Sequence, residues 1–298
     1  MGFAIRTPFD WQLRTRTLAL GERTLVMAAV NLTPDSFSGD GLARAAHDEA
    51  VNFALQRLDG GADILDLGAE STRPGARPVS ADAEQARLLP VLEAVLRERP
   101  SAIVSVDTYH ASTARASASA GAEIINDVSG LLWDDDMGHT VAKLHTGLIL
   151  MHTRGRPTEW RTQPAIPAAD VVPLVLDGLD ERLAAARAAG ILQNRIVLDP
   201  GFGFGKRGTE NFALLAGFER FSELGRPLLA GLSLKGFLGA IVAPLNALSR
   251  TNATMAANVA AILAGAHIVR VHDLQEAREA VAIADAIADA TTPSYRVP

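Results

Sequence analysis

The sequence predicts an α/β protein with a single (β/α)8 barrel, a TIM barrel. Eight apolar runs of β type follow one another along the 298 residues, and each is followed by a stretch that can form a helix. Strands that alternate with helices form parallel sheets, and eight such units close a barrel of about 250 residues. Each run also holds or ends on a polar residue, and barrel active sites gather at the carboxyl ends of the strands. We therefore expect an enzyme whose polar strand ends form one functional ring.

The predicted strands follow from these runs in chain order. With the polar residue of each in parentheses, they are LVMAAVN (Asn31), ILDLG (Asp66), AIVSVD (Asp107), AEIIND (Asn126 and Asp127), LILMH (His152), RIVLD (Asp199), PLLAGLS (Ser233, with Lys235 just beyond) and HIVRVH (Arg270 and His272).

The segments between the runs predict a ring of helices. Residues 43–58 place Val51, Ala54, Leu55 and Leu58 on one helical face. Ser80, with Glu84 four residues on, suggests the start of a helix that continues to about residue 99. The loop at 153–167 is rich in proline and is expected to be a lid or a surface loop. Further helices are predicted over 112–120, 137–145, 168–189, 211–224, 237–243, 254–264 and 275–289.

The two ends of the chain are expected to lie outside the barrel of residues 25–290. Residues 1–24 precede the first barrel strand, and segments 9–13 and 16–20 can form a short hairpin that covers the barrel floor. The last residues, 291–298, read as a loose tail. No linker or shift in composition marks a second domain.

Composition narrows the class of function. The net charge of −6 argues against a general nucleic-acid surface, which needs a basic footprint, but local cations can still bind a small anion. The absence of cysteine excludes disulfides and thiolate chemistry. No apolar run reaches the roughly 18 residues of a membrane span, and the first residues lack a signal-peptide core. The simplest expectation is a cytoplasmic protein without membrane or nucleic-acid partners.

The segment GFGFGK at 201–206 resembles a nucleotide-binding loop only superficially. Its spacing differs from that of a P-loop, since Lys206 is followed by Arg207 rather than by Ser or Thr. A dinucleotide fingerprint would need a third glycine at a longer interval. We therefore interpret the segment as a tight turn after Asp199.

Three other polar features have competing interpretations. His152 lacks the partners of an H-E-x-x-H metal site, so a structural or substrate-shaping role is favoured over metal binding. Glu70 is either a general base or an anchor for its loop. The acidic run Asp134–Asp136 reads as a solvated loop.

Two sets of residues point to ligand chemistry. Arg270 and His272 alternate along one strand and therefore share a face, which makes an anion site plausible. A second set would project into the same barrel mouth from different strands and suits a flat heterocycle with N–H and C=O edges, unless some members are ordinary polar residues of the barrel layers: Asp107, Asn126, Asp199 and Lys235.

Eight blocks of the chain together resemble dihydropteroate synthases. The blocks are NLTPDSFSGDG, GADILDLGAESTRPGA, VSVDTY, GAEIINDVSG, LMHTRGRP, LDPGFGFGK, GLSLKGFLG and GAHIVRVHD, in order from about residue 25 to 290. The resemblance implies a Mg²⁺-dependent transferase of folate synthesis and a sulfonamide target, working as a homodimer. It implies that 6-hydroxymethyl-7,8-dihydropterin pyrophosphate and p-aminobenzoate give 7,8-dihydropteroate and pyrophosphate.

The resemblance also implies roles for single residues. The pterin ring would be held by Asp107, Asn126, Asp199 and Lys235, with Ile149 and Met151 beside it. The pyrophosphate would meet Asn31, Arg270 and His272, with Mg²⁺ on Asn31. Of these, Asn31, Asp107, Lys235, Arg270 and His272 would carry the catalysis. The p-aminobenzoate would be enclosed by Phe37, Thr72, Arg73, Pro74, Phe204 and Gly236.

One segment departs from the family pattern. Where the family usually reads SRKSF, this chain has Ser233-Leu234-Lys235-Gly236-Phe237, without the arginine and the second serine. This affects the expected affinity for p-aminobenzoate and sulfonamides more than pterin binding. Two alternatives therefore stay open: a non-catalytic pterin-binding paralogue, and a pterin-dependent methyltransferase domain. The intact STRPG loop argues against the methyltransferase.

Overall fold

Eight parallel strands form the barrel in the computed structural model, which describes residues 6–32, 43–70, 78–242 and 250–290. Apart from the sixth and seventh strands, each strand pairs with the next along the chain, and the last also pairs with the first. A single parallel bridge between Leu198 and Leu228 links the two remaining edges. The predicted fold is confirmed. The strands are β3 (Leu25–Asn31), β4 (Ile64–Gly68), β5 (Val104–Asp107), β6 (Ile124–Asp127), β7 (Gly147–Met151), β8 (Ile196–Asp199), β9 (Leu229–Ala230) and β10 (Ile268–Val271).

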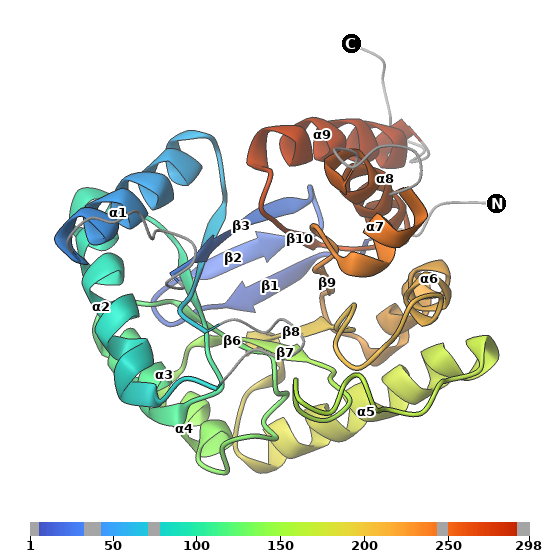
Figure 1. Ribbon diagram of the computed structural model, residues 1–298, viewed down its shortest axis with the longest axis horizontal. Coiled ribbons are helices and arrows are strands. Elements are labelled where there is room, and N and C mark those ends of the chain that lie inside the picture. Colours follow the sequence, from blue (N-terminus) through green and yellow to red (C-terminus); the bar gives the residue numbers. More distant parts are fainter. Residues whose placement is uncertain (1–5, 33–42, 71–77, 243–249, 291–298) are drawn as a thin grey trace.

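Helices surround these strands as an outer ring (Figure 1). Each predicted helix except the one over 211–224 is present within a few residues. Ser80 caps the second helix, where its hydroxyl accepts from the Ala83 amide at 3.3 Å. No helix in the described part of the chain is long and apolar enough to cross a membrane. The helices are α1 (Ala43–Asp59), α2 (Ala81–Glu98), α3 (Ala111–Ser119), α4 (Met137–Leu144), α5 (Ala168–Ala188), α6 (Glu210–Ala216), α7 (Gly236–Val242), α8 (Arg250–Leu263) and α9 (Leu274–Ala290), with 3-10 turns η1 (Gln193–Arg195) and η2 (Phe218–Leu224).

Two elements differ from the prediction. The helix expected over 211–224 is broken at Gly217 into α6 and the 3-10 turn η2. A Cβ at Gly217 would lie 2.7 Å from Val172 of α5, so this close approach requires glycine. The strand expected to reach Ser233 ends at Ala230, and the chain then leaves the sheet.

The N-terminal hairpin seals the barrel floor, as predicted. Strands β1 (Phe9–Gln12) and β2 (Thr17–Leu20) pair in antiparallel fashion. Trp11 and Leu13 are buried in one cluster with residues of the barrel strands, and the Trp11 indole donates to the Arg195 carbonyl at 2.8 Å. A Cβ at Gly147 would lie 2.8 Å from Leu13, which shows how closely the hairpin packs. With this end filled, a ligand cavity can form at the carboxyl ends of the strands.

This packing predicts a large contribution of Trp11 to stability. We expect Trp11→Ala to lower the free energy of unfolding by about 3–5 kcal/mol, the usual cost of deleting a buried tryptophan. Urea denaturation measures the change. Leu192→Ala is the control, because Leu192 is 58% exposed. Equal effects of the two substitutions would contradict the role of the hairpin as a floor.

Candidate active site

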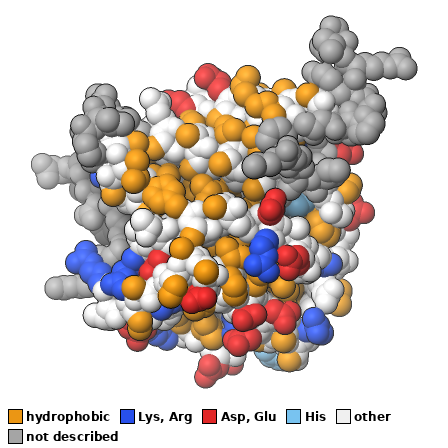
Figure 2. Space-filling model, turned by 90° about the vertical axis from the view of Figure 1, so that its right-hand side faces the viewer, with side chains coloured by type: hydrophobic (Ala, Val, Ile, Leu, Met, Phe, Trp, Pro, Cys, Tyr) orange, Lys and Arg blue, Asp and Glu red, His pale blue; other side chains and the backbone are white. Residues whose placement is uncertain are grey.

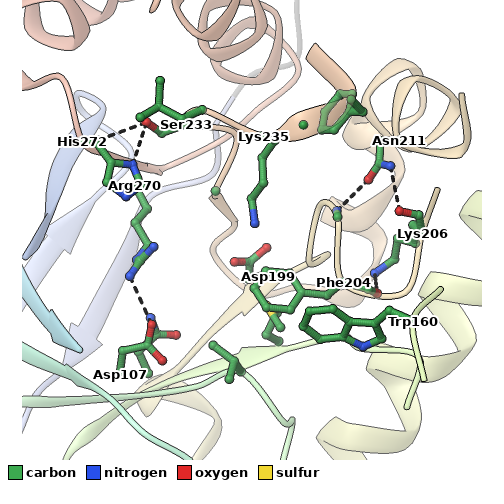
Figure 3. Close-up of a pocket in the computed structure, with 18 of the residues that line it drawn as sticks. Asp107, Trp160, Asp199, Phe204, Lys206, Asn211, Ser233, Lys235, Arg270 and His272 are labelled. Atoms are coloured by element: carbon green, nitrogen blue, oxygen red, sulfur yellow. Dashed lines mark hydrogen bonds and ion pairs between the residues drawn. The ribbon is translucent and has the colours of Figure 1, made fainter. Parts of the chain in front are cut away.

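A cavity of about 660 Å³ opens at the carboxyl ends of the barrel strands (Figure 3). Its lining includes at least one residue at or just beyond the end of each strand. The expected convergence of the polar strand ends is therefore present in the structure. Among the residues that line the cavity are Asn31, Asp107, Asn126, Met151, Trp160, Asp199, Phe204, Lys206, Ser233, Lys235, Arg270 and His272.

Arg270 joins two buried carboxylates at one side of the cavity. Its Nε donates to Asp66 Oδ2 at 2.6 Å and its Nη2 to Asp107 Oδ2 at 3.1 Å. The Asn126 amide nitrogen donates to the same Asp66 oxygen at 3.1 Å. Burial raises the pKa of Asp107 to about 8, and the charge of Asp66 adds to the rise, whereas Arg270 opposes it. The guanidinium therefore partly compensates two carboxylates that would otherwise repel each other.

Lys235 and Asp199 face each other at the centre of the cavity (Figure 3). Burial lowers the pKa of Lys235 to about 8, against the attraction of Asp199. Burial raises the pKa of Asp199, while the Gly201 amide, which donates to Oδ1 at 2.7 Å, works against the rise. Lys235 Nζ also lies 4.2 Å from the centroid of the Phe204 ring, a cation–π contact.

His272 is oriented by its neighbours on both sides. Its Nδ1 lies 2.9 Å from Ser233 Oγ, and its Nε2 lies 3.3 Å from the Asn31 amide nitrogen. The amide nitrogen of Asn31 faces Nε2, an arrangement that suits the tautomer in which Nε2 accepts and Nδ1 carries the ring proton. The carboxamide oxygen of Asn31 is then directed away from the imidazole. Both Arg270 and His272 line the cavity, which confirms that they share a face.

The segment 201–206 is a tight turn, as interpreted from its sequence. Gly201, Gly203 and Gly205 have φ values of +71°, +83° and +71°, which favour glycine. A Cβ at Gly201 would lie 2.0 Å from the His152 carbonyl oxygen. Lys206 is buried and donates to the carbonyls of His152, Gly201 and Phe204 at 3.2, 2.8 and 3.3 Å. Its ammonium thus ties the turn to the end of β7, and burial lowers its pKa to about 7.

The sequence left the roles of His152, Glu70 and Asp134 open, and the structure shows the contacts of each. His152 is buried, with its ring against Gly178 of α5, and burial lowers its pKa well below the ordinary value; both observations favour the structural role. Glu70 accepts from the Tyr109 hydroxyl at 3.0 Å and the Val79 amide at 3.3 Å, which favours the loop anchor. Asp134 is not simply solvated, because it accepts from the Ala111 amide at the start of α3 at 2.8 Å.

Most of the described residues expected in the site lie in the cavity. Met151, Phe204 and Gly236 line it, together with the polar residues above. Ile149 does not: it is fully buried in the floor cluster beneath the cavity. The remaining expected residues lie outside the described ranges: Phe37, Thr72, Arg73 and Pro74.

Sequence reasoning missed several residues at this site, among them Asp66, Trp160 and Asn211. Asp66 was noted as a strand residue, and a carboxylate between Leu65 and Leu67 in a buried strand was the signal that it needed a cationic partner. Trp160 and Asn211 line the cavity from a loop and a helix start. Neither stood in a periodic pattern that would have identified it.

Comparisons with known proteins agree with this geometry. The family model described as "Pterin binding enzyme" matches residues 27–272. A dihydropteroate synthase of Bacillus subtilis (strain 168) is 40% identical over 270 residues, covering 91% of this chain and 90% of that protein. A mitochondrial folate synthesis bifunctional protein of Pisum sativum is 40% identical over 276 residues, 89% of this chain but only 53% of that protein.

A solved structure gives the same result. The dihydropteroate synthase of Xanthomonas albilineans with 4-aminobenzoic acid has a TM-score of 0.85 at 38% identity, covering 95% of this chain and 100% of that one. The same enzyme in complex with 7,8-dihydropteroate has a TM-score of 0.81 at 37% identity, with equal coverage. The chain therefore belongs to the pterin-binding enzyme family and, within it, to the dihydropteroate synthases.

Proposed function

We propose that this chain joins 6-hydroxymethyl-7,8-dihydropterin pyrophosphate to p-aminobenzoate, giving 7,8-dihydropteroate and pyrophosphate. The observation that carries the proposal is the meeting of Asp107, Asn126, Asp199 and Lys235 in one cavity, with Arg270 and His272 beside them. The family membership supports it, since a relative has been solved with 4-aminobenzoic acid and with 7,8-dihydropteroate.

The polar ring suits the edges of a pterin. The carboxylates of Asp107 and Asp199 accept from ring N–H and amino groups, and the Lys235 ammonium donates to a ring nitrogen or carbonyl. The amide nitrogen of Asn126 donates to Asp66, so the carboxamide oxygen of Asn126 is available as a further acceptor. Met151 packs beside the ring. Ile149 would support it only from beneath, because it lies in the floor cluster.

The pyrophosphate would lie between Arg270, His272 and Asn31. In the described part of the chain, no three His, Cys, Asp or Glu side chains form a metal cage. Mg²⁺ commonly needs none, because substrate phosphates and water complete its coordination. The carboxamide oxygen of Asn31, directed away from His272, fits as its protein ligand. Bound Mg²⁺ supplies charge neutralisation on the pyrophosphate.

The bond changes follow from this arrangement. The bond from the pterin methylene carbon to the pyrophosphate oxygen breaks and leaves a cationic methylene, while Arg270 stabilises the departing charge. The amino nitrogen of p-aminobenzoate then attacks that carbon and loses a proton. No side-chain nucleophile is needed, since the arylamine is itself one. By the family resemblance, Phe37, Thr72, Arg73 and Pro74, which lie outside the described residues, would help to exclude water from the cation.

The aryl amine would occupy the side of the cavity near Phe204 and Gly236. Leu234 has a φ of +56° and is 38% exposed at this end. A Cβ at Gly236 would meet no atom within 4 Å, so a serine side chain fits there. The altered segment therefore leaves the pocket intact in shape and changes its polarity.

One assay decides between the open alternatives. Pyrophosphate release from the pterin substrate is measured with and without p-aminobenzoate. Release that depends on p-aminobenzoate and yields 7,8-dihydropteroate supports the proposal. Pterin binding without release would favour the non-catalytic paralogue, for which Leu234 and Gly236 are the supporting observation. The two relatives described above are named for folate synthesis and for dihydropteroate synthase, which favours the synthase over the methyltransferase alternative.

We also propose the homodimer implied by the family resemblance. Figure 2 shows hydrophobic side chains gathered on the side of the molecule that carries α6 to α9. Exposed hydrophobic patches of this kind mark surfaces that bind other proteins. Sedimentation of the purified chain distinguishes dimer from monomer.

The pKa of Lys235 predicts a falling alkaline limb of pterin affinity. Above a pKa of about 8 the ammonium loses its charge, so the affinity should fall as the pH rises through 8. Asp107 ionises in the same range, and its ionisation creates an acceptor and acts in the opposite direction, so the contribution of Lys235 is read as the difference in affinity between the chain and Lys235→Arg. Calorimetry between pH 6.5 and 9.5 measures the limb. Lys235→Arg should shift it to higher pH, and an unshifted limb would exclude Lys235 as its origin.

The altered segment predicts weak recognition of p-aminobenzoate. Restoring the family residues with Leu234→Arg and Gly236→Ser adds a cation and a hydroxyl, so the KM for p-aminobenzoate should fall several-fold, since about 1.4 kcal/mol is tenfold. Sulfonamide inhibition should strengthen, and pterin affinity should stay unchanged. Leu192→Arg, which adds a cation at a distant exposed position, is the control.

Two results would contradict this reading of the segment. If neither the p-aminobenzoate nor the sulfonamide constants change in the restored variant, the two differences are neutral. If the parent chain never turns over and the restored variant does, the parent is a non-catalytic paralogue.

A further inference from the structure

Trp160 forms part of the cavity wall on the side away from Arg270 (Figure 3). The residue belongs to the loop between β7 and α5 and is only 4% exposed. Its ring meets the Phe204 ring edge-on, with centroids 5.0 Å apart and an interplanar angle of 79°. This is a favourable geometry for two aromatic rings. The two rings together make one aromatic wall, which we call the Trp160–Phe204 wall.

The position of the Trp160 ring does not depend on a ligand. Its indole nitrogen donates to the Gly155 carbonyl at 3.0 Å, so its single polar group is occupied. The loop is tied to the β8 turn, because Arg154 Nη1 donates to the Gly205 carbonyl at 3.0 Å. Gln163 in turn donates to the Arg154 carbonyl at 3.1 Å. The indole therefore presents fixed apolar surface to the cavity.

Phe204 is held by a separate set of contacts. The buried Lys206 ammonium donates to the Phe204 carbonyl, and the Asn211 side chain accepts from the Gly203 amide at 2.7 Å and donates to the Lys206 carbonyl at 3.0 Å. Lys235 approaches the Phe204 ring from another side. The β8 turn thus positions Phe204, as the β7–α5 loop positions Trp160.

Beside the wall, the polar side chains of Lys206 and Asn211 also line the cavity, but they already bond to the backbone. The lining here includes the apolar side chains of Leu234, Phe237 and Ala240, with Gly236 between them. Selection of a ligand at this end therefore depends on ring shape. A rigid wall discriminates by size, because the rings cannot move aside without breaking the loop contacts.

We propose that Trp160 is a specificity-determining residue for the aryl amine. This inference rests on the proposed function. The indole closes the far end of the aryl subsite, so that a single benzene ring fits and a fused two-ring aryl amine does not. Packing against the indole also contributes to the binding of the single ring.

The test compares kcat and KM for p-aminobenzoate and for the fused-ring analogue 4-amino-1-naphthoate. Trp160→Ala should raise the KM for p-aminobenzoate about three- to tenfold, the range expected for one aromatic contact, with kcat little changed. It should raise the kcat/KM ratio of naphthoate to benzoate at least tenfold. Trp160→Phe should have an intermediate effect, because a smaller ring stays in place.

Trp133→Phe is the matched control. Trp133 also meets an aromatic ring edge-on, that of Tyr109, with centroids 5.0 Å apart at 78°, but it does not line the cavity. The chain has three tryptophans, so fluorescence gives a second readout. Quenching by p-aminobenzoate, with pterin and pyrophosphate present, should be lost in Trp160→Phe and kept in Trp133→Phe.

The outcomes separate this inference from the proposed function. If the unmodified chain does not convert p-aminobenzoate, the proposed function fails and this inference falls with it. If it converts p-aminobenzoate but both Trp160 variants keep the normal KM and substrate ratio, only this inference is overturned. If Trp160→Ala does not fold, Trp160→Phe decides by the same ratio and the same quenching.

Discussion

The polar side of the site depends on the sharing of one guanidinium between two carboxylates. Asp66 is fully buried and Asp107 largely so, and two such charges without a partner would cost several kcal/mol or become protonated. Arg270 stands between them and meets both. Asp66 also fixes the amide of Asn126, so a residue that does not line the cavity determines which atoms Asn126 presents to it. The barrel brings these groups together from β4, β5, β6 and β10.

The opposite side of the cavity is stabilised by a different kind of interaction. There a buried ammonium, Lys206, is satisfied by three backbone carbonyls rather than by a carboxylate. Glycines with positive φ allow the β8 turn to approach the end of β7 closely. This turn carries Phe204, one of the two rings of the Trp160–Phe204 wall. One side of the cavity thus offers charge and directed hydrogen bonds, and the other offers rigid apolar shape. This division suits the joining of a polar heterocycle to an aryl amine.

The sequence predicted the barrel well because each strand is a local signal: an apolar run, then a polar residue, then a helical stretch. Parallel topology brings the ends of such runs together, so the meeting of Asn31, Asp107, Asp199 and Arg270 followed from the fold. What the sequence could not supply depends on contacts between distant segments. At Gly217, where the helix ends, a side chain would collide with Val172 of α5. Trp160 lies in a loop that Arg154 ties to the β8 turn. Ile149 was expected beside the pterin, but it comes two residues before Met151 in β7 and is therefore buried in the floor cluster, away from the cavity.

It follows from the proposed function that Asp66 should govern pterin binding through Arg270 and Asn126, without touching the ligand. Calorimetry of pterin binding to Asp66→Asn tests it most directly. Asp63→Asn is the matched control, because Asp63 also pairs with an arginine, Arg23, but lies away from the cavity. Loss of a charge-assisted hydrogen bond is worth about 1.5–3 kcal/mol, so Asp66→Asn should weaken pterin binding at least about tenfold, while Asp63→Asn leaves it unchanged. Unchanged affinity in a folded Asp66→Asn variant would contradict the account.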